Sequence, residues 1–312
     1  MPLTLPLTLP PRDSRRFDVV GTGEASLDLV AVTHGWPPPN TKVPLHDFRI
    51  LPGGQTATAV AAVARLGWRS RFVGAFGDDE FGARVMDALT SEGVEVTAVR
   101  RPAAASRFAV VLVDGRSGER SILERRDARL ALEATDFDIG VFTSGRVLMV
   151  DATDVPASTR AARAARAAGV PTIVDVEFPM AGIEELLEQI DVIIAAGSFP
   201  AAYTGASTVA QGLRDLGERF RPAIAVATLG PEGSVAWCQS RVIRTPAHVV
   251  TAVDTTGAGD AFRGGFAAGW LALDPVADVE RLLVYANRVA GLNCRAVGAQ
   301  TALPTPAEAG QV

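Results

Sequence analysis

The chain has 312 residues and a formal net charge of −5, with 48% hydrophobic and 21% charged residues. This composition is typical of a soluble globular protein with one or two domains, and the acidic balance gives no reason to expect nucleic-acid binding. Two cysteines, Cys238 and Cys294, indicate neither a disulfide scaffold nor a zinc site, and they suit a reducing cytoplasm. No stretch has the roughly 20 uninterrupted apolar residues that a membrane span needs.

Both ends of the chain are predicted to be tails. Residues 1–16 are apolar but broken by prolines, and their basic residues come last, whereas a signal peptide places them first. We therefore expect a loose N-terminal tail over residues 1–16 and a short C-terminal tail over residues 306–312.

Two segments in the first half of the chain are predicted to be strands of a small separate sheet. Residues 42–50 have the character of a strand, and the apolar run 107–113 leads into the turn sequence 114–119 and a second run, 120–124. Two runs separated by a glycine-containing turn indicate a β-hairpin.

A glycine pair, Gly53 and Gly54, opens a predicted helix of small residues over 55–66, and Gly67 fits the position just beyond its end. A short strand and a glycine-punctuated turn follow over 72–82. Small side chains allow a helix to pack closely against a sheet, so this pattern alone is compatible with plain core packing.

From residue 147 onward, short apolar strands alternate with helices. We predict strands at 147–151, 170–176, 191–195 and 223–227, with helices at 157–168, 183–189 and 208–219. This alternation indicates an α/β domain in which helices cover both faces of a parallel sheet. Ligands bind such sheets beyond the carboxyl ends of the strands, where four polar residues stand: Asp151, Asp175, Glu177 and Thr228. Each could equally be an ordinary polar residue at a strand end.

The most informative segment is 253–262. Gly257, Ala258 and Gly259 carry little side-chain bulk and precede an apolar helical pattern, so their N–H groups can point at an anion at the helix N-terminus. Asp260 follows directly. A carboxylate repels an anion, so Asp260 fits a base that takes a proton from a hydroxyl attacking a phosphoryl group. The alternative is a tight turn in which Asp260 only caps the helix.

Together, segments 51–67 and 253–262 resemble the two signatures of the ribokinase-like, or PfkB, carbohydrate kinase family. The resemblance extends from about Phe17 to about Pro304. It implies a kinase domain over residues 17–305, with lid strands at about 41–50 and 107–124 that form a small β-lid over the sugar site. It also implies ATP and Mg²⁺ as cofactors, a small-molecule sugar as acceptor, and a homodimer formed through the lid.

The resemblance further implies the site residues. Asp260 matches the catalytic base, and Gly257, Ala258 and Gly259 match the anion hole. Asp28 matches the acid that binds sugar hydroxyls, and Gly53 and Gly54 match the backbone that approaches the sugar. Apart from the resemblance, we predict that the acceptor site also includes Gln55, Thr58, Arg107 of the hairpin and Asp151 at its strand end. The nucleotide side includes Thr228, Gly230, Gly233, Thr255 and Asn287. The segments around Asp254 and Gly298 match a monovalent cation site for K⁺.

The sequence departs from the family pattern at two places. Thr58 stands where many members carry Asn, which leaves the identity of the sugar open. Residues 196–200 lack the Asn-x-x-Glu motif that orders Mg²⁺ in many members, as does a ketohexokinase-like branch of the family. We therefore expect Mg²⁺ to be held mainly by nucleotide phosphates and water.

The predicted function is ATP-dependent phosphorylation of a hydroxyl on a sugar or sugar-like molecule. The alternatives are a nucleoside kinase and a sugar-binding regulatory protein that has lost catalysis. Arg107, Arg125 and Arg126 lie in or just after the lid hairpin, and an arginine facing the acceptor would favour an anionic sugar. Surface charge is the alternative for all three.

Overall fold

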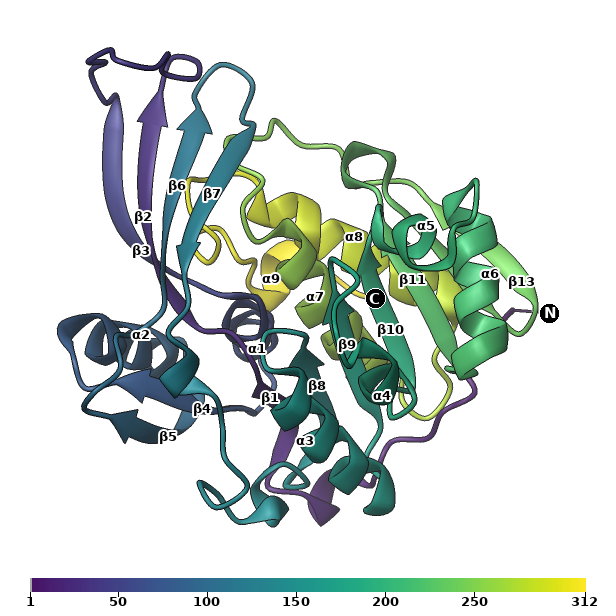
Figure 1. The fold of residues 1–312 in the computed structure, drawn as a ribbon. Coiled ribbons are helices and arrows are strands. Elements are labelled where there is room, and N and C mark those ends of the chain that lie inside the picture. The colour runs from purple at the N-terminus through teal and green to yellow at the C-terminus, as the bar shows by residue number, and fades with distance from the viewer. Residues whose placement is uncertain (1) are drawn as a thin grey trace.

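The computed structural model describes residues 2–312 and has a nine-stranded central sheet with helices on both faces (Figure 1). Every neighbouring pair from β5 to β11 is parallel, and β12 and β13 extend one edge through antiparallel pairing. In spatial order the strands are β13 (Arg241–Thr245), β12 (Ser234–Cys238), β11 (Ile224–Thr228), β10 (Val192–Ala196), β9 (Thr172–Val176), β8 (Gly145–Asp151), β1 (Phe17–Thr22), β4 (Ser70–Gly77) and β5 (Glu95–Arg101).

Alternate side chains of the strands point to opposite faces and so build two cores. In β8, Val147 and Met149 join one core, whereas Leu148 and Val150 join the other. The first core is covered by α1 (Gln55–Arg65), α2 (Glu80–Ser91), α7 (Ala258–Leu273) and α8 (Val279–Asn293). The second is covered by α3 (Val155–Ala167), α4 (Ile183–Leu187), α5 (Phe199–Thr204) and α6 (Val209–Phe220). The predicted three-layer α/β/α domain is confirmed. Within residues 2–312 no helix is both long and apolar enough to cross a membrane.

Helix α7 packs closely between α1 and α8 because Gly264 and Gly265 have no side chains at the contacts. A Cβ at Gly264 would lie 2.5 Å from the Cβ of Ala62 in α1, and a Cβ at Gly265 would lie 2.8 Å from the Cβ of Val289 in α8. A larger residue at either place would push the helices apart. This packing sets where the N-terminus of α7 meets the end of the sheet.

A second, four-stranded sheet forms the lid, which stands above one end of the large sheet (Figure 1). Its strand order is β3 (Asp47–Gly53), β2 (Ser26–Thr33), β6 (Phe108–Asp114) and β7 (Arg120–Arg125). The hairpin predicted over 107–124 is therefore present as β6 and β7.

Two features of the lid differ from the sequence prediction. The strand expected over 42–50 runs instead over Asp47–Gly53, and residues 41–46 lie outside it. Pro44 has no N–H group to donate to a sheet, which favours a later start. The sequence analysis also missed β2, the strand that pairs with both β3 and β6 and carries Asp28.

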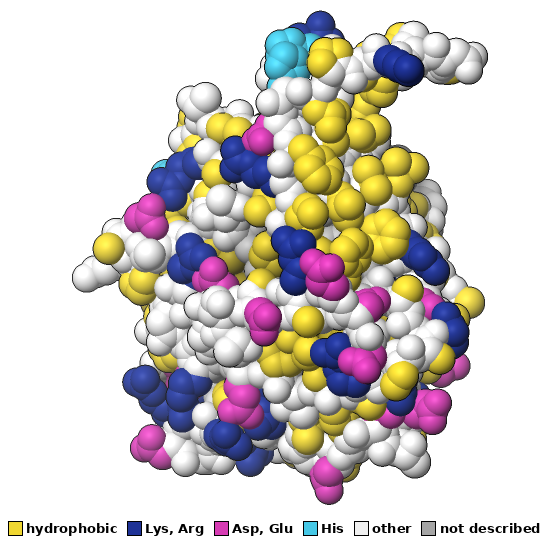
Figure 2. Space-filling view, turned by 90° about the vertical axis from the view of Figure 1, so that its left-hand side faces the viewer, with side chains coloured by type: hydrophobic (Ala, Val, Ile, Leu, Met, Phe, Trp, Pro, Cys, Tyr) yellow, Lys and Arg dark blue, Asp and Glu magenta, His cyan; other side chains and the backbone are white. Residues whose placement is uncertain are grey.

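One face of the lid contacts the rest of the protein, and the other is apolar and exposed. Val30 and Val111 pack with Val297, which lies in the loop after α8. The strand register places Leu29, Ile50, Val110 and Leu123 together on the opposite face. Figure 2 shows apolar side chains gathered over the lid.

The N-terminal segment does not form the loose tail predicted for residues 1–16. Leu5 and Leu9 are buried in the first core, Leu5 N donates to Ala277 O at 2.8 Å, and Thr4 forms an isolated β-bridge with Asp278. At the other end, residues 306–312 include the short helix α9 (Pro306–Ala309), and Ala309 is buried. Both ends of the described chain therefore pack onto the domain.

We expect Leu5→Ala and Leu9→Ala each to lower the free energy of unfolding by about 2 kcal/mol, because each substitution leaves a cavity in the core. Urea denaturation followed by circular dichroism measures the change. Leu45→Ala is the matched control, because Leu45 is 51% exposed and should cost almost nothing. If both core variants were as stable as the wild type, the packed N-terminal segment would not contribute to the free energy of unfolding.

Candidate active site

The N-terminus of α7 begins at Gly257, the residue before the helix. Its φ of 75° lies in the left-handed region, and a Cβ there would lie 2.7 Å from Ala299 O, so glycine suits this position. A Cβ at Gly259 would meet no atom within 4 Å. The first turn of α7 therefore presents free N–H groups next to open space, which suits a bound anion.

Asp260 lies in this first turn, and its side chain is 16% exposed. Burial, together with the nearby carboxylates of Glu177 and Glu24, raises the pKa of Asp260 well above its usual range. One oxygen, Oδ1, accepts a hydrogen bond from Arg263 Nη2 at 2.6 Å. The sequence analysis missed Arg263, although it lies just beyond the 253–262 motif.

Asp28 projects from β2 and is buried, with Oδ1 accepting a hydrogen bond from Ser26 Oγ at 2.9 Å. Burial raises the pKa of Asp28 to about 6. Gly53 lies against it, since a Cβ on Gly53 would be 2.1 Å from Asp28 Oδ2. The glycine of the first motif thus leaves room for this carboxylate.

The rest of the first motif shapes the turn into α1. Gly54 caps the helix with a φ of 93°, and a Cβ there would lie 2.6 Å from the Cα of Ala25. Gln55 is the first helical residue, and Thr58 lies one turn later. Thr58 is fully buried, and its Oγ1 accepts a hydrogen bond from Gln300 Nε2 at 3.1 Å. Its hydroxyl is therefore bound within the protein.

Asp151, at the end of β8, is also held by protein donors. Its Oδ2 accepts from Glu24 N at 2.6 Å and from Thr56 Oγ1 at 2.7 Å, while Oδ1 accepts from Thr153 N at 2.9 Å. Asp151 thus ties β8 to α1 and to the turn before β2. Glu24, for which the sequence predicted no role, is buried there, and burial raises the pKa of its carboxyl to about 7.

The lid arginines are mostly engaged by protein groups. Arg126 pairs with Glu124 at 2.8 Å and lies 3.7 Å from Glu24, and Arg107 Nη1 donates to Gly23 O at 3.4 Å. Arg125 pairs in register with Phe108, so it points to the face opposite Glu124.

A fourth lid arginine, which the sequence analysis did not single out, reaches across to the segment before α7. Arg120 Nη1 donates to Thr255 Oγ1 at 2.8 Å. Thr255 lies five residues before Asp260, so this contact joins the lid to the loop that carries the open helix N-terminus.

Four of the residues predicted for the nucleotide side lie around the turn between β11 and β12 and the part of α8 beside it. Thr228 ends β11, and Gly230 and Gly233 bound the turn that leads to β12. Asn287 of α8 donates hydrogen bonds of 2.9 Å to Ser234 Oγ and Thr245 Oγ1, and so links α8 to β12 and β13. A Cβ at Gly233 would lie 2.1 Å from Thr245 O, so the turn depends on glycine.

Asp254 and Gly298 contact each other, as the cation prediction required. Gly298 N donates to Asp254 Oδ2 at 2.8 Å, and Thr256 donates to Oδ1 from its N and its Oγ1. Asn293 Oδ1 is buried nearby without a hydrogen-bond partner, and its Nδ2 donates to Ala299 O at 2.9 Å. The oxygens gathered here are the ligand type that hard cations prefer.

The segment 196–200, which lacks the Asn-x-x-Glu motif, carries no acidic side chain. Ala196 ends β10, and Phe199 is buried at the start of α5. Among residues 2–312, no group of three or more His, Cys, Asp or Glu side chains is arranged to hold a metal ion.

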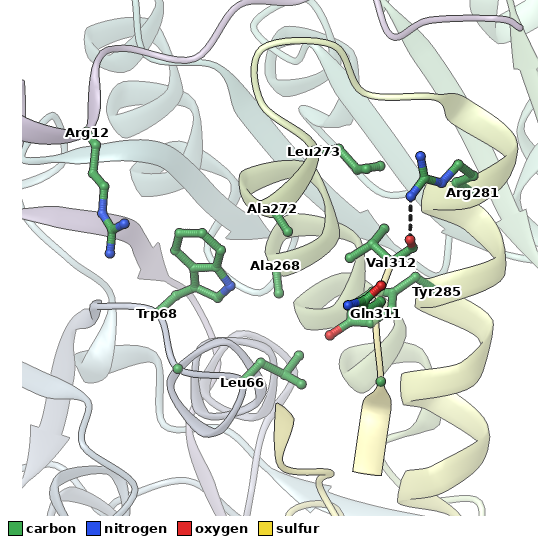
Figure 3. Close-up of a pocket in the computed structure, with 12 residues that line it drawn as sticks. Arg12, Leu66, Trp68, Ala268, Ala272, Leu273, Arg281, Tyr285, Gln311 and Val312 are labelled. Atoms are coloured by element: carbon green, nitrogen blue, oxygen red, sulfur yellow. Dashed lines mark hydrogen bonds between the residues drawn. The ribbon is translucent and has the colours of Figure 1, made fainter. Parts of the chain in front are cut away.

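A pocket of about 520 Å³ lies elsewhere on the protein (Figure 3). It is lined by residues such as Trp68, Leu273, Arg281 and Tyr285. Asp260 lies in the first turn of α7 and Leu273 is its last residue, so the two ends of this helix are roughly 20 Å apart. This cavity is therefore separate from the site at the helix N-terminus.

Comparison with known proteins agrees with this geometry. Residues 16–306 match the pfkB family carbohydrate kinases. A fructokinase of Klebsiella pneumoniae is 35% identical over 81% of this chain and 89% of its own length, and a ribokinase of Mus musculus is 29% identical over 92% and 91%. The crystal structure of a putative ribokinase from Agrobacterium tumefaciens has a TM-score of 0.86 at 27% identity, covering 94% of this chain and 96% of that one. The chain belongs to the PfkB family of carbohydrate kinases, which are ATP-dependent phosphotransferases.

Proposed function

We propose that this protein transfers the γ-phosphoryl group of ATP to a hydroxyl of a neutral sugar, with Asp260 as the general base. The observation that carries the proposal is Asp260 in the first turn of α7, next to the open space beside Gly259. A proton acceptor and an anion-binding helix end are thus adjacent. Phosphoryl transfer needs both at the reacting group.

In the proposed reaction, the acceptor hydroxyl oxygen forms a bond to the γ-phosphorus, and the bond from that phosphorus to the β–γ bridging oxygen breaks. The hydroxyl proton passes to the Asp260 carboxylate. N–H groups of the first turn of α7, at Ala258 and Gly259, hold the negative charge of the transferring group. ADP leaves with the bridging oxygen. Mg²⁺ bound to the nucleotide phosphates would supply charge neutralisation.

The proposed acceptor is held from two sides. The Asp28 carboxylate accepts hydrogen bonds from sugar hydroxyls, and the backbone at Gly53, Gly54 and Gln55 approaches the sugar closely. Thr58 and Asp151 keep α1 and the turn before β2 in place through the hydrogen bonds that they make. Arg107 supports the same turn through Gly23 O.

The charges around the proposed acceptor position favour a neutral sugar. Arg126 is neutralised by Glu124, and Arg125 points to the other face of the lid. The carboxyl groups of Glu24 and Asp28 are buried there, and they would repel a sugar that already carries a phosphate or carboxylate. Together with the likeness to fructokinases, this favours a neutral sugar such as fructose.

The proposed nucleotide site lies on the other side of the α7 N-terminus, where Thr228, Gly230 and Gly233 border the nucleotide. Thr255 contributes at the phosphate end, and Asn287 holds the edge strands that flank the adenine. A monovalent cation such as K⁺ would bind near Asp254 and the Gly298 loop, where the unpartnered Asn293 Oδ1 offers a further oxygen.

The main experiment measures ADP release with ATP, Mg²⁺ and a panel of neutral sugars, acidic sugars and nucleosides. We expect turnover with a neutral sugar, and a decrease in kcat of roughly 10²–10⁴ in Asp260→Asn with ATP binding nearly unchanged. Preference for a nucleoside would establish the nucleoside kinase alternative. No turnover with any acceptor would favour the sugar-binding regulatory alternative.

Asp28→Ala should raise the KM for the acceptor at least about tenfold and leave the KM for ATP within about twofold, because hydrogen bonds to one ligand are lost. In the wild type, the acceptor KM should rise as the pH falls below about 6, where Asp28 becomes protonated. Steady-state kinetics with each substrate varied in turn measures both effects. Equal changes in both KM values would contradict the assignment.

We also propose that two copies pair through the apolar outer face of the lid. Leu123 is 61% exposed on that face, whereas its neighbour Ile122 is 50% exposed on the inner face. Leu123→Asp should therefore yield monomers in multi-angle light scattering, because it places a charge in an apolar contact. Ile122→Asp is the control and should stay dimeric. A monomeric wild type would end this proposal.

A further inference from the structure

The helix that carries the proposed base also carries a buried arginine, Arg263. Arg263 follows Asp260 by three residues on α7, and its side chain is 2% exposed. Its Nη2 donates to Asp260 Oδ1 at 2.6 Å, and its Nη1 lies 2.8 Å from Asp175 Oδ2 on β9. One guanidinium thus bridges the base and a carboxylate of the central sheet.

The sheet register explains how Asp175 reaches this position. Ile173 contributes to the core beneath α7, and Asp175, two residues later on β9, points to the same face. The strand register pairs Asp175 with Asp151 on β8. Two carboxylates therefore stand side by side under α7, and Arg263 pairs directly with one of them.

Asp260 is surrounded mainly by acidic groups. Glu177 approaches from the end of β9, Glu24 from the turn before β2, and Asp151 from the end of β8. The cations facing it are Arg120 of the lid and Arg263 of its own helix. Arg120 donates to Thr255. Among the described residues, Arg263 is the cation in direct hydrogen-bond contact with the base.

We propose that Arg263 is a positioning residue that favours the ionised form of Asp260 and ties its Oδ1, so that Oδ2 is free to take the acceptor proton. This inference rests on the proposed role of Asp260 as the base. A buried carboxylate among other carboxylates binds a proton unless a cation compensates its charge. A protonated Asp260 could not accept the hydroxyl proton.

Asp175, the second carboxylate that contacts Arg263, remains charged when Asp260 is protonated. When Asp260 takes the proton from the acceptor hydroxyl, its negative charge disappears, and its ion pair with Arg263 weakens. Asp175 still pairs with the guanidinium, so no buried charge is left alone at that moment. Asp175 thus allows Asp260 to be charged before the transfer and neutral after it.

The test compares the pH dependence of kcat/KM for the acceptor in the wild type, Arg263→Gln and Arg263→Lys. In Arg263→Gln the acidic limb should move up by about one pH unit or more, which corresponds to a roughly tenfold loss on that limb. Activity should recover as the pH rises. Arg263→Lys retains a cation, so its limb should lie between those of the other two proteins.

Arg146→Gln is a matched control. Arg146 is as buried, at 3% side-chain exposure, and pairs with Asp274 at 2.6 Å, but it lies at the start of β8, away from the site. We expect it to lower stability without moving the acidic limb. If Arg263→Gln loses activity by the same factor at every pH, the positioning role is wrong. A wild type without kinase activity would instead contradict the proposed function.

The pH dependence of unfolding stability tests the role of Arg263 without relying on kinase activity. We expect Asp260 in Arg263→Gln to have a higher pKa in the folded than in the unfolded state. Its contribution to stability is then present at low pH and is lost as the pH rises through the folded-state value. Arg263→Gln should thus lose stability on going from pH 5 to pH 8 relative to Arg263→Gln/Asp260→Asn. Parallel stability curves for these two variants would overturn the inference.

Discussion

The site depends on buried carboxylates that must each find a donor or a cation. Asp151 and Asp175 are paired in register on adjacent strands and point to the same face of the sheet. Asp151 is satisfied by backbone and hydroxyl donors from three segments, and Asp175 by Arg263. An unpaired carboxylate here would cost several kcal/mol. The segments that supply the donors are therefore held in place around the site.

Close packing fixes the position of α7. Gly264 and Gly265 bring this helix against α1 and α8, so its first turn meets the ends of the parallel strands. The open space beside Gly259 and the carboxylate of Asp260 lie in that turn. The same helix carries the N–H groups proposed to bind the transferring phosphoryl group, the proposed base Asp260, and Arg263, which contacts Asp260.

The lid contributes residues to both proposed substrate sides. Its strand β2 carries Asp28, and its strand β7 carries Arg120, which contacts Thr255 beside the α7 N-terminus. The proposed acceptor space would therefore have one wall from the lid and one from the large domain. Such an arrangement can exclude water from the phosphoryl group, which a kinase needs to avoid hydrolysis of ATP.

Local patterns in the sequence were sufficient to predict five of the parallel strands, several helices and the two glycine motifs, but β1, β5, β12, β13 and the long helix α8 were not predicted. Strand and helix periods are set by neighbouring residues, and Gly257, Gly259 and Asp260 lie within one short segment. The hairpin β6–β7 was predicted for the same reason. In contrast, β2 was not predicted, and the strand predicted over 42–50 lies several residues before β3. Pairing between segments decides which residues of an apolar run become a strand.

Contacts between distant segments were decided only by the tertiary structure. Nothing in the sequence shows that Leu5 and Leu9 are buried or that Thr58 binds Gln300, since the partners are far apart in the chain. The ion pair of Arg263 with Asp175 joins residues 88 positions apart through the register of β9 beneath α7. The sequence by itself determined the class of chemistry, because the anion loop and its carboxylate are local. The tertiary structure decided which charges surround that carboxylate, because electrostatic interactions depend on distance in space.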